Sequence, residues 1–176
     1  MKPLITLLAS AALTLAAQDA ALGARVHGLM PMGDLRDLTD GQLGAGVAVY
    51  VAIPVGNGLV LRPLVGTQFI PKGGTLSLAG TKTSVTSVDL MVDALWFPGL
   101  DLDRGPYLIG SVGGQQWRLS ATGTSSSTLS YTRIGASAGL GYQASPRLGF
   151  EARGFWSPIA PTITATGLMI GATVRF

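Results

Sequence analysis

Residues 43–53 read LGAGVAVYVAI, and their alternation indicates the architecture of the whole chain. Every odd-numbered position except Ala45 carries a large aliphatic side chain, whereas the even-numbered positions are mostly small. Successive side chains of a β-strand point to opposite faces, so this period of two predicts a strand with one strongly apolar face. A hairpin turn follows directly, because Asn57-Gly58 tolerates the positive φ angles that tight turns require.

The same period recurs along the chain and predicts further strands. They lie near residues 25–33, 42–53, 59–69, 84–97, 106–119, 129–144, 147–157 and 163–176. The connections at 54–58, 98–105 and 145–146 are turn-like, those at 34–41, 70–83 and 120–128 are longer and polar, and 158–162 is a short exception. Short turns at one end and longer loops at the other are typical of outer-membrane barrels, whose turns face the periplasm. We therefore expect an all-β, eight-stranded antiparallel up-and-down transmembrane β-barrel with both termini in the periplasm.

Composition supports a lipid environment. Hydrophobic residues make up 47% of the 176 residues and charged residues 12%, and the mean hydropathy is +0.43. After the N-terminus no segment approaches the roughly 18 consecutive apolar residues of a transmembrane helix. The formal charge is only +3 and the basic residues are scattered, which argues against nucleic acid as a partner. The chain has no cysteine, which excludes a disulfide framework and thiolate metal sites.

The N-terminus has the pattern of a cleaved secretory signal peptide. Residues 1–3 are basic in character, and the apolar residues 4–17 are fewer than the roughly 20 that span a bilayer. Small residues allow cleavage after Ala16 or after Gly23, and we favour the first. The expected organisation is a signal peptide at 1–16, with its boundary between 16 and 23, and a barrel domain at 24–176. An N-terminal anchor or a buried helix is the alternative.

Charged residues on the predicted strands indicate which face meets lipid. An Arg or Lys on the lipid face at mid-bilayer costs about 2–4 kcal/mol, so strand charges should point inward. Glu151 and Arg153 share one face of their strand, opposite Phe150 and Trp156. We predict a structural network of paired charges in a side-chain-filled lumen, because pairing avoids the cost of isolated buried charges. Its members are Arg62, Asp89, Asp93, Arg133, Glu151, Arg153 and Arg175.

Aromatic residues give a second indication, since outer-membrane barrels carry aromatic girdles at both interfaces. We expect Trp96, Tyr107, Tyr142, Phe150 and Phe176 near the periplasmic ends, and Phe69, Trp117, Tyr131 and Trp156 near the outer ends. Tyr50 and Phe155 have inner-face parity and should fill the lumen. The alternation of the two strand faces alone would also suit a soluble β-sandwich or barrel. The aromatic girdles and the difference in loop length between the two ends favour the membrane barrel.

Pro63 has no backbone N–H to donate to a neighbouring strand, and a β-bulge is one explanation for its place within a strand.

Three further features point to a family. They are the C-terminal strand 171–176 ending in Phe176, the hairpin at 139–151, and Trp96-Phe97-Pro98 leading to Pro106-Tyr107. With these features the chain resembles the small bacterial outer-membrane β-barrel family, represented by the membrane domain of OmpA and by OmpX. The resemblance covers the whole mature chain and implies that Phe176 is the barrel-assembly signal. It also implies an outer-membrane location, lipid as surroundings, and the export and barrel-assembly machineries as partners during biogenesis.

The sequence offers little catalytic chemistry. His27 is the one histidine, and no hydroxyl residue lies within two positions of it, so a local base and nucleophile pair is missing. We therefore expect a non-enzymatic, monomeric protein without cofactor or metal, with a structural role or a surface-interaction role through its outer loops. The polar residues 121–128 are the candidate recognition loop, with an unknown ligand. The alternatives are a lipid-modifying outer-membrane enzyme and a small pore.

Overall fold

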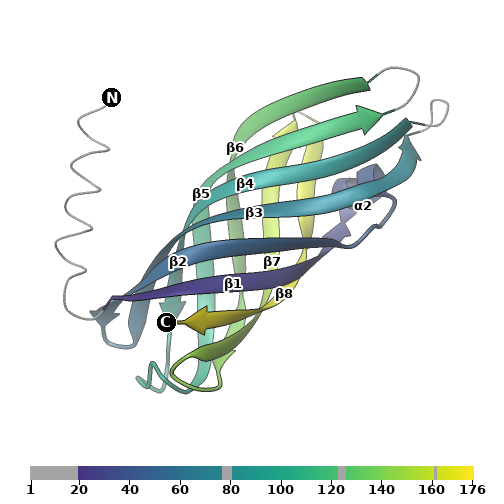
Figure 1. Cartoon of the computed structure of the whole chain (residues 1–176). Coiled ribbons are helices and arrows are strands. Elements are labelled where there is room, and N and C mark those ends of the chain that lie inside the picture. The colour runs from purple at the N-terminus through teal and green to yellow at the C-terminus, as the bar shows by residue number, and fades with distance from the viewer. Residues whose placement is uncertain (1–19, 77–80, 123–125, 161) are drawn as a thin grey trace, which may run out of the picture.

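The computed structural model describes residues 20–76, 81–122, 126–160 and 162–176, which form a closed antiparallel β-barrel (Figure 1). Each strand pairs with the next along the chain, and β8 pairs with β1. The strands are β1 (Ala21–Met32), β2 (Gly44–Gly56), β3 (Leu59–Leu76), β4 (Thr81–Trp96), β5 (Gly105–Thr122), β6 (Ser126–Gln143), β7 (Leu148–Ala160) and β8 (Ile163–Arg175). The predicted eight-stranded up-and-down barrel is confirmed. The predicted signal peptide at 1–16 lies outside the described residues.

The two ends of the barrel differ. At one end, which we call the turn end, β1 begins and β8 finishes, and the Phe176 amide donates a hydrogen bond to the Leu22 carbonyl at 2.9 Å. The turns after β2, β4 and β6 also lie at this end (Figure 1). Asn57 and Gly58 have φ angles of 53° and 73°, which confirms the predicted hairpin turn. The opposite end carries the helix α2 (Gly33–Thr39), and we call it the helix end.

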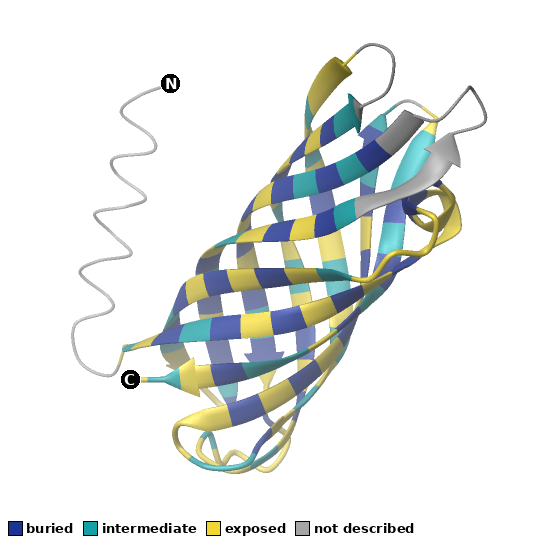
Figure 2. Cartoon of the chain, turned by 45° about the vertical axis from the view of Figure 1, so that its right-hand side comes forward, coloured by how far each residue is buried: buried dark blue, intermediate teal, exposed yellow. Residues whose placement is uncertain are grey.

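Buried and exposed residues alternate along the strands, as Figure 2 shows. The inward side chains of β2 include Ala48 and Tyr50, which are buried, whereas Val47 and Val49 are 53% and 58% exposed. Large apolar side chains therefore cover the outside of the barrel. We call this surface the apolar belt, and it includes Leu22, Val26, Val47, Val49, Val65, Val88, Leu90, Val112, Ile134, Leu140, Phe150 and Ile170. Such a surface fits a lipid environment and not water.

The connections at the helix end are more ordered than the sequence indicates. Residues 33–39 form α2 where a polar loop was expected, and the predicted loops 70–83 and 120–128 are largely strand. Both loops were predicted too long, because Gly, Ser and Thr favour loops by composition, while here residues 70–76, 81–83, 120–122 and 126–128 lie in paired strands. The remaining parts of these two loops, residues 77–80 and 123–125, lie outside the described residues. In the described part of the chain no helix is long and apolar enough to cross a membrane.

Pro63 interrupts one ladder without a bulge. It pairs with Val92 of β4 in an unbroken register. On the β2 side, pairing stops at Tyr50–Leu64 and resumes at Ile53–Leu61 in the same register. The missing N–H of Pro63 therefore explains a local gap in the ladder, and the bulge suggested from the sequence is not found.

Candidate functional site

A buried ion cluster occupies the middle of the lumen. The Arg62 guanidinium donates to Asp93 Oδ2 at 2.6 and 3.0 Å and lies 2.8 Å from Glu151. Arg153 donates to the same Asp93 oxygen at 2.9 Å and also pairs with Glu151. Four of the predicted network residues thus lie together, and each is at most 5% exposed. With Arg25 they form what we call the central cluster.

Asp89 lies apart from this cluster. Its carboxylate accepts hydrogen bonds from Gln68 Nε2 at 2.6 Å, Ser87 Oγ at 2.8 Å and Gln115 Nε2 at 3.1 Å. Neutral donors therefore satisfy this carboxylate, in place of the charged partner that membership of the predicted network implies. The buried charges in the lumen nevertheless balance. The three buried arginines are Arg25, Arg62 and Arg153, and the three buried carboxylates are Asp89, Asp93 and Glu151.

Arg133 and Arg175 do not join the central cluster. The Arg133 guanidinium lies 5.6 Å from the ring centroid of Tyr131 and donates to the Thr132 carbonyl. Arg175 lies at the turn end, where it donates to the Leu102 carbonyl at 3.1 Å and lies 3.9 Å from Asp103. Their inclusion in one network was wrong, because strand parity determines the face of a side chain but not its height along the barrel.

Two inner residues of β1 were missed from the sequence. Arg25 and His27 are both 7% exposed, and Arg25 lies 3.8 Å from Asp93. The strand alternates Arg25-Val26-His27-Gly28, so the same parity argument would have found both. His27 packs where the neighbouring strands carry Gly46 and Gly171, and a Cβ at either glycine would lie 2.5–2.7 Å from His27 atoms.

The chemistry around His27 does not resemble a catalytic site. Among the described residues, neither ring nitrogen of His27 has a hydrogen-bond partner, so no hydroxyl is held beside it as a nucleophile. Within the same part of the chain, no group of three or more acidic or histidine side chains is placed to hold a metal ion.

Apolar layers lie on both sides of the central cluster. Towards the turn end, buried residues that include Tyr50, Leu95 and Tyr107 pack together. Towards the helix end, Trp117, Phe155 and Met169 pack with Leu35 and Leu38 of α2. The helix therefore closes the lumen at that end, and Leu35 is fully buried. Buried side chains of these two layers and of the central cluster thus lie inside the barrel, and an eight-stranded barrel has a narrow interior.

The aromatic residues divide between the two faces. Trp96, Tyr142, Phe150, Phe69 and Trp156 are 47–51% exposed on the outside, and Phe176 is 79% exposed. Tyr107 and Trp117 are each 1% exposed and donate to Glu151 and Ser157, and Tyr131 packs on the inner cluster under α2. Their assignment to lipid-facing girdles was wrong, because it rested on position along the strand and not on parity. Tyr50 and Phe155 lie in the lumen, as their parity indicates.

One strand edge remains unpaired at the helix end. β6 pairs with β5 over its whole length from Ser126 to Gln143. Its pairing with β7 begins only at Ala136, opposite Trp156. Residues 126–135 therefore have no strand on their second side in the described chain. The ladder ends two residues before Pro158, which has no N–H to donate.

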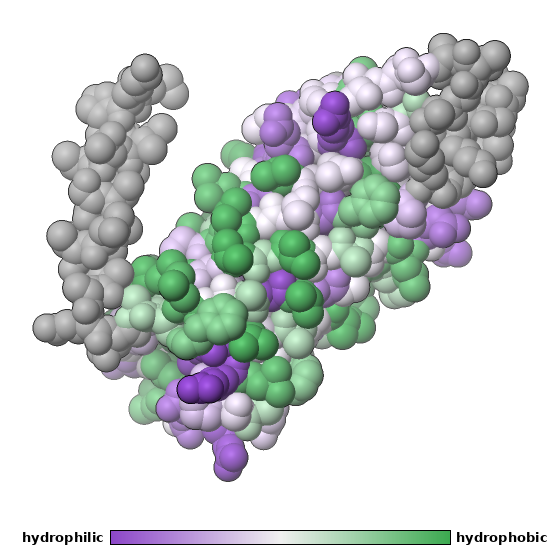
Figure 3. Space-filling model, in the orientation of Figure 1, coloured by the Kyte–Doolittle hydropathy of each residue, from purple (hydrophilic) through white to green (hydrophobic). Residues whose placement is uncertain are grey.

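The unpaired segment belongs to a sheet that extends beyond the apolar belt. On β5 and β6 the outward side chains change from Val112 and Ile134 to Gln116, Arg118 and Thr132 towards the helix end. Figure 3 shows the same change as green residues around the body and pale or purple residues over the upper part of these strands. We call the part of β3–β6 beyond the belt the protruding sheet.

Solved structures with the same architecture identify the fold. Ail, the attachment invasion locus protein of Yersinia pestis, superposes with a TM-score of 0.60 at 15% identity, over 89% of this chain and 97% of Ail. Neisserial surface protein A gives 0.59 at 16% identity, with the same coverage of both chains. The fold is that of the small outer-membrane β-barrels. The N-terminal barrel domain of OprF from Pseudomonas aeruginosa agrees, with a TM-score of 0.61, 11% identity and 89% and 97% coverage.

The likeness is one of fold and not of sequence. No protein-family model matches the chain, and no curated protein matches it. The similarity therefore lies in the closed eight-stranded antiparallel barrel itself. Its individual function has to be argued from its own residues.

Proposed function

We propose that this protein is a non-enzymatic outer-membrane barrel that anchors the protruding sheet at the cell surface, where the free edge of β6 binds an extended segment of a partner protein. The single observation that carries the proposal is the unpaired edge at residues 126–135. The barrel itself supplies a rigid, lipid-embedded scaffold, and its aromatic residues Trp96, Tyr142 and Phe150 at the turn end would form an interfacial girdle.

The orientation follows from polarity. The protruding sheet presents Gln116, Arg118 and Thr132 outward, and these side chains suit water and not hydrocarbon. Short turns connect the strands at the opposite end, as in the periplasmic turns of other membrane barrels. We place the helix end outside the cell and both termini in the periplasm.

The chemistry of the free edge favours strand addition. A free edge presents a row of backbone N–H and C=O groups that an incoming extended peptide can pair with. Soluble proteins usually protect such edges with charges, bulges or covering elements. Here residues 126–130 are exposed and uncharged, and Arg133 is the one charged residue between 126 and 135.

The closed lumen supports a binding role in preference to transport. A solute path would have to cross the central cluster and the apolar layers on both sides of it. An enzyme would need a reactive group, and the buried His27 lacks a neighbouring nucleophile among the described residues. No observation favours either alternative function.

Hydrogen exchange tests the proposal directly. The purified barrel in detergent is mixed with a synthetic extended peptide of alternating Thr and Val, and backbone exchange is followed by mass spectrometry. We expect slower exchange at residues 126–135 when the peptide is present, because its backbone would pair with the β6 edge. Unchanged exchange there, with the peptide bound elsewhere or not at all, would overturn the proposal.

Matched lysine variants provide the control. Ser130→Lys together with Thr132→Lys places charges on the free edge strand, which opposes strand pairing. Gln116→Lys together with Ser120→Lys places the same charges on β5, whose two sides are already paired. We expect the β6 variant alone to lose the peptide-dependent protection.

A further inference from the structure

A small cavity lies in the lumen beside the central cluster, between β1, β7 and β8. Its volume is about 10 Å³. A space of roughly 10–15 Å³ is the smallest that holds one particle the size of a water molecule, so this cavity admits a single small guest. The residues that line it are Arg25, His27, Glu151, Arg153, Met169 and Gly171.

The two carboxylates of the central cluster are already occupied by other donors. Asp93 Oδ2 accepts hydrogen bonds from Arg62 and Arg153. The second oxygen of Asp93 accepts one from Ser111 Oγ at 2.6 Å. Glu151 Oε1 lies 2.8 Å from Arg62, and Glu151 Oε2 accepts from Arg153 Nε at 3.1 Å. Neither carboxylate is therefore left to accept a hydrogen bond from a third guanidinium group.

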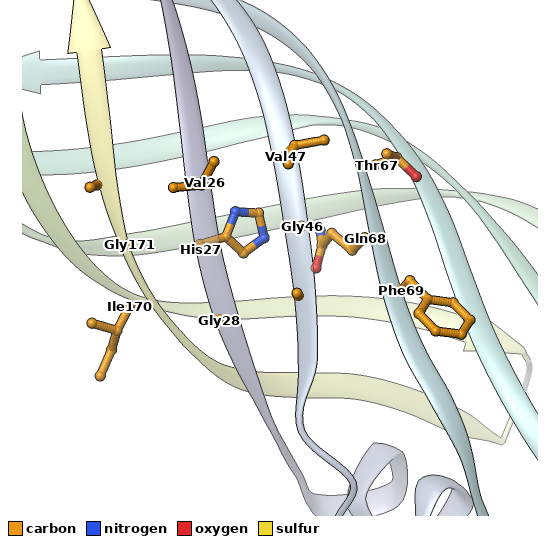
Figure 4. Close-up of a pocket in the computed structure, with 12 residues that line it drawn as sticks. Val26, His27, Gly28, Gly46, Val47, Thr67, Gln68, Phe69, Ile170 and Gly171 are labelled. Atoms are coloured by element: carbon orange, nitrogen blue, oxygen red, sulfur yellow. The ribbon is translucent and has the colours of Figure 1, made fainter.

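Arg25 is that third guanidinium group. Its Nη1 atom lies 3.8 Å from Asp93, which is beyond hydrogen-bond distance. Within the described part of the chain, neither Nε nor Nη1 of Arg25 has a hydrogen-bond partner, and the same holds for both ring nitrogens of His27. Both side chains are buried, and Figure 4 shows the His27 ring beside Gly46 of β2, where a larger residue would collide with it. Arg25 and His27 thus bring unsatisfied N–H groups to the wall of the cavity.

The charge of the central cluster indicates what kind of guest fits. The cluster contains three guanidinium groups and two carboxylates, which gives a net charge of +1. The third buried carboxylate of the lumen belongs to Asp89, which is held by neutral donors and forms no ion pair among the described residues. A buried charge without a partner is strongly unfavourable, so one more negative charge beside Arg25 would stabilise the cluster.

We propose that this cavity binds one halide ion, which is chloride under physiological conditions. The free N–H groups of Arg25 hold the ion, Arg153 adds positive charge, and His27 supplies a further donor. Glu151 also lines the cavity, but its negative charge is already paired with Arg62 and Arg153. A water molecule would fill the same space without balancing the charge, and the volume is too small for a phosphate group.

This inference goes beyond strand addition and is independent of it. The halide site lies inside the barrel, whereas the peptide is proposed to bind the outer edge of β6. Loss of halide binding would leave that edge unchanged, so either proposal can fail while the other holds.

Crystals of the folded protein grown in sodium bromide test the site directly, because bromide scatters X-rays anomalously and replaces chloride. We expect one buried anomalous peak within hydrogen-bond distance of Arg25 Nε or Nη1. Two outcomes would overturn the proposal. One is a lumen without an anomalous peak, with a water molecule only at the cavity. The other is bromide at the protein surface alone, which would be an adventitious ion only.

Unfolding by urea in lipid vesicles tests the site in solution, with sodium bromide compared with sodium gluconate at equal ionic strength. Gluconate is too large for the cavity. A ligand that binds only the folded chain stabilises it, so a site half-filled at about 10 mM halide raises the folded-to-unfolded ratio about tenfold at about 100 mM. We expect this rise for the unaltered protein, and equal stability in the two salts would overturn the proposal.

A matched pair of variants assigns the effect to Arg25. Arg25→Met removes the unpaired guanidinium and keeps an apolar side chain, so the folded-to-unfolded ratio should become the same in both salts. Arg118→Met makes the same charge change on the exposed face of β5 and should keep the tenfold rise. Heat-dependent gel mobility verifies that both variants are folded. A tenfold rise that persists in Arg25→Met would overturn the site.

Discussion

Arg153 is the residue through which the parts of the central cluster are joined. Its guanidinium contacts Asp93, Glu151 and Ser111, and its side chain is 2% exposed. Replacing it by leucine leaves both carboxylates short of a partner in a buried site. We expect Arg153→Leu to lower the free energy of unfolding by about 3–5 kcal/mol, the usual cost of removing one member of a buried pair. Urea titration of the barrel in lipid vesicles measures this.

The neighbouring position supplies the control. Ala152 points outward on the same strand, so Ala152→Leu adds apolar surface to the belt and should leave stability nearly unchanged. Equal losses for the two variants would contradict the inward and outward assignment of β7.

At the scale of an element, α2 is held mainly by its buried face. The helix has 7 residues and would be unstable alone, and Leu35 and Leu38 attach it to the apolar layer in the lumen. Leu35→Ala removes buried methyl groups, at a usual cost of about 2–5 kcal/mol. We expect faster hydrogen exchange at 34–39 with little change in the strands. Asp37→Ala, on the exposed side of the helix, should leave the exchange at 34–39 unchanged. Equally slow exchange in the Leu35→Ala and Asp37→Ala variants would contradict the conclusion that Leu35 holds α2 in place.

At the scale of the whole molecule, the barrel should not conduct ions. The lumen contains the central cluster and an apolar layer on each side of it, and α2 covers the helix end. We expect no discrete current steps when the folded protein, verified by a heat-dependent mobility shift, is added to a planar bilayer. Regular steps that scale with protein concentration would show an open path and contradict the filled lumen.

The architecture could be predicted because its signals are local. Alternation in residues 43–53, the Asn57-Gly58 turn and the inward pairs such as Glu151 and Arg153 each depend on neighbours only a few positions away. Successive side chains of a pleated strand point to opposite faces, so the alternation of residue types is enough to assign the inward and outward faces without knowledge of long-range contacts. Where parity was not applied, as for Tyr107, Trp117 and His27, the face was assigned wrongly or missed.

Contacts between distant strands were decided by register, which the sequence does not display. Parity placed Asp89 and Arg133 inside, but the stagger of the strands set their heights, so neither meets the central cluster. The free edge of β6 likewise depends on where pairing with β7 ends. Local pattern thus determined the barrel and its two faces. Closure and stagger of the sheet decided which side chains meet, because these bring together residues that are far apart in the chain.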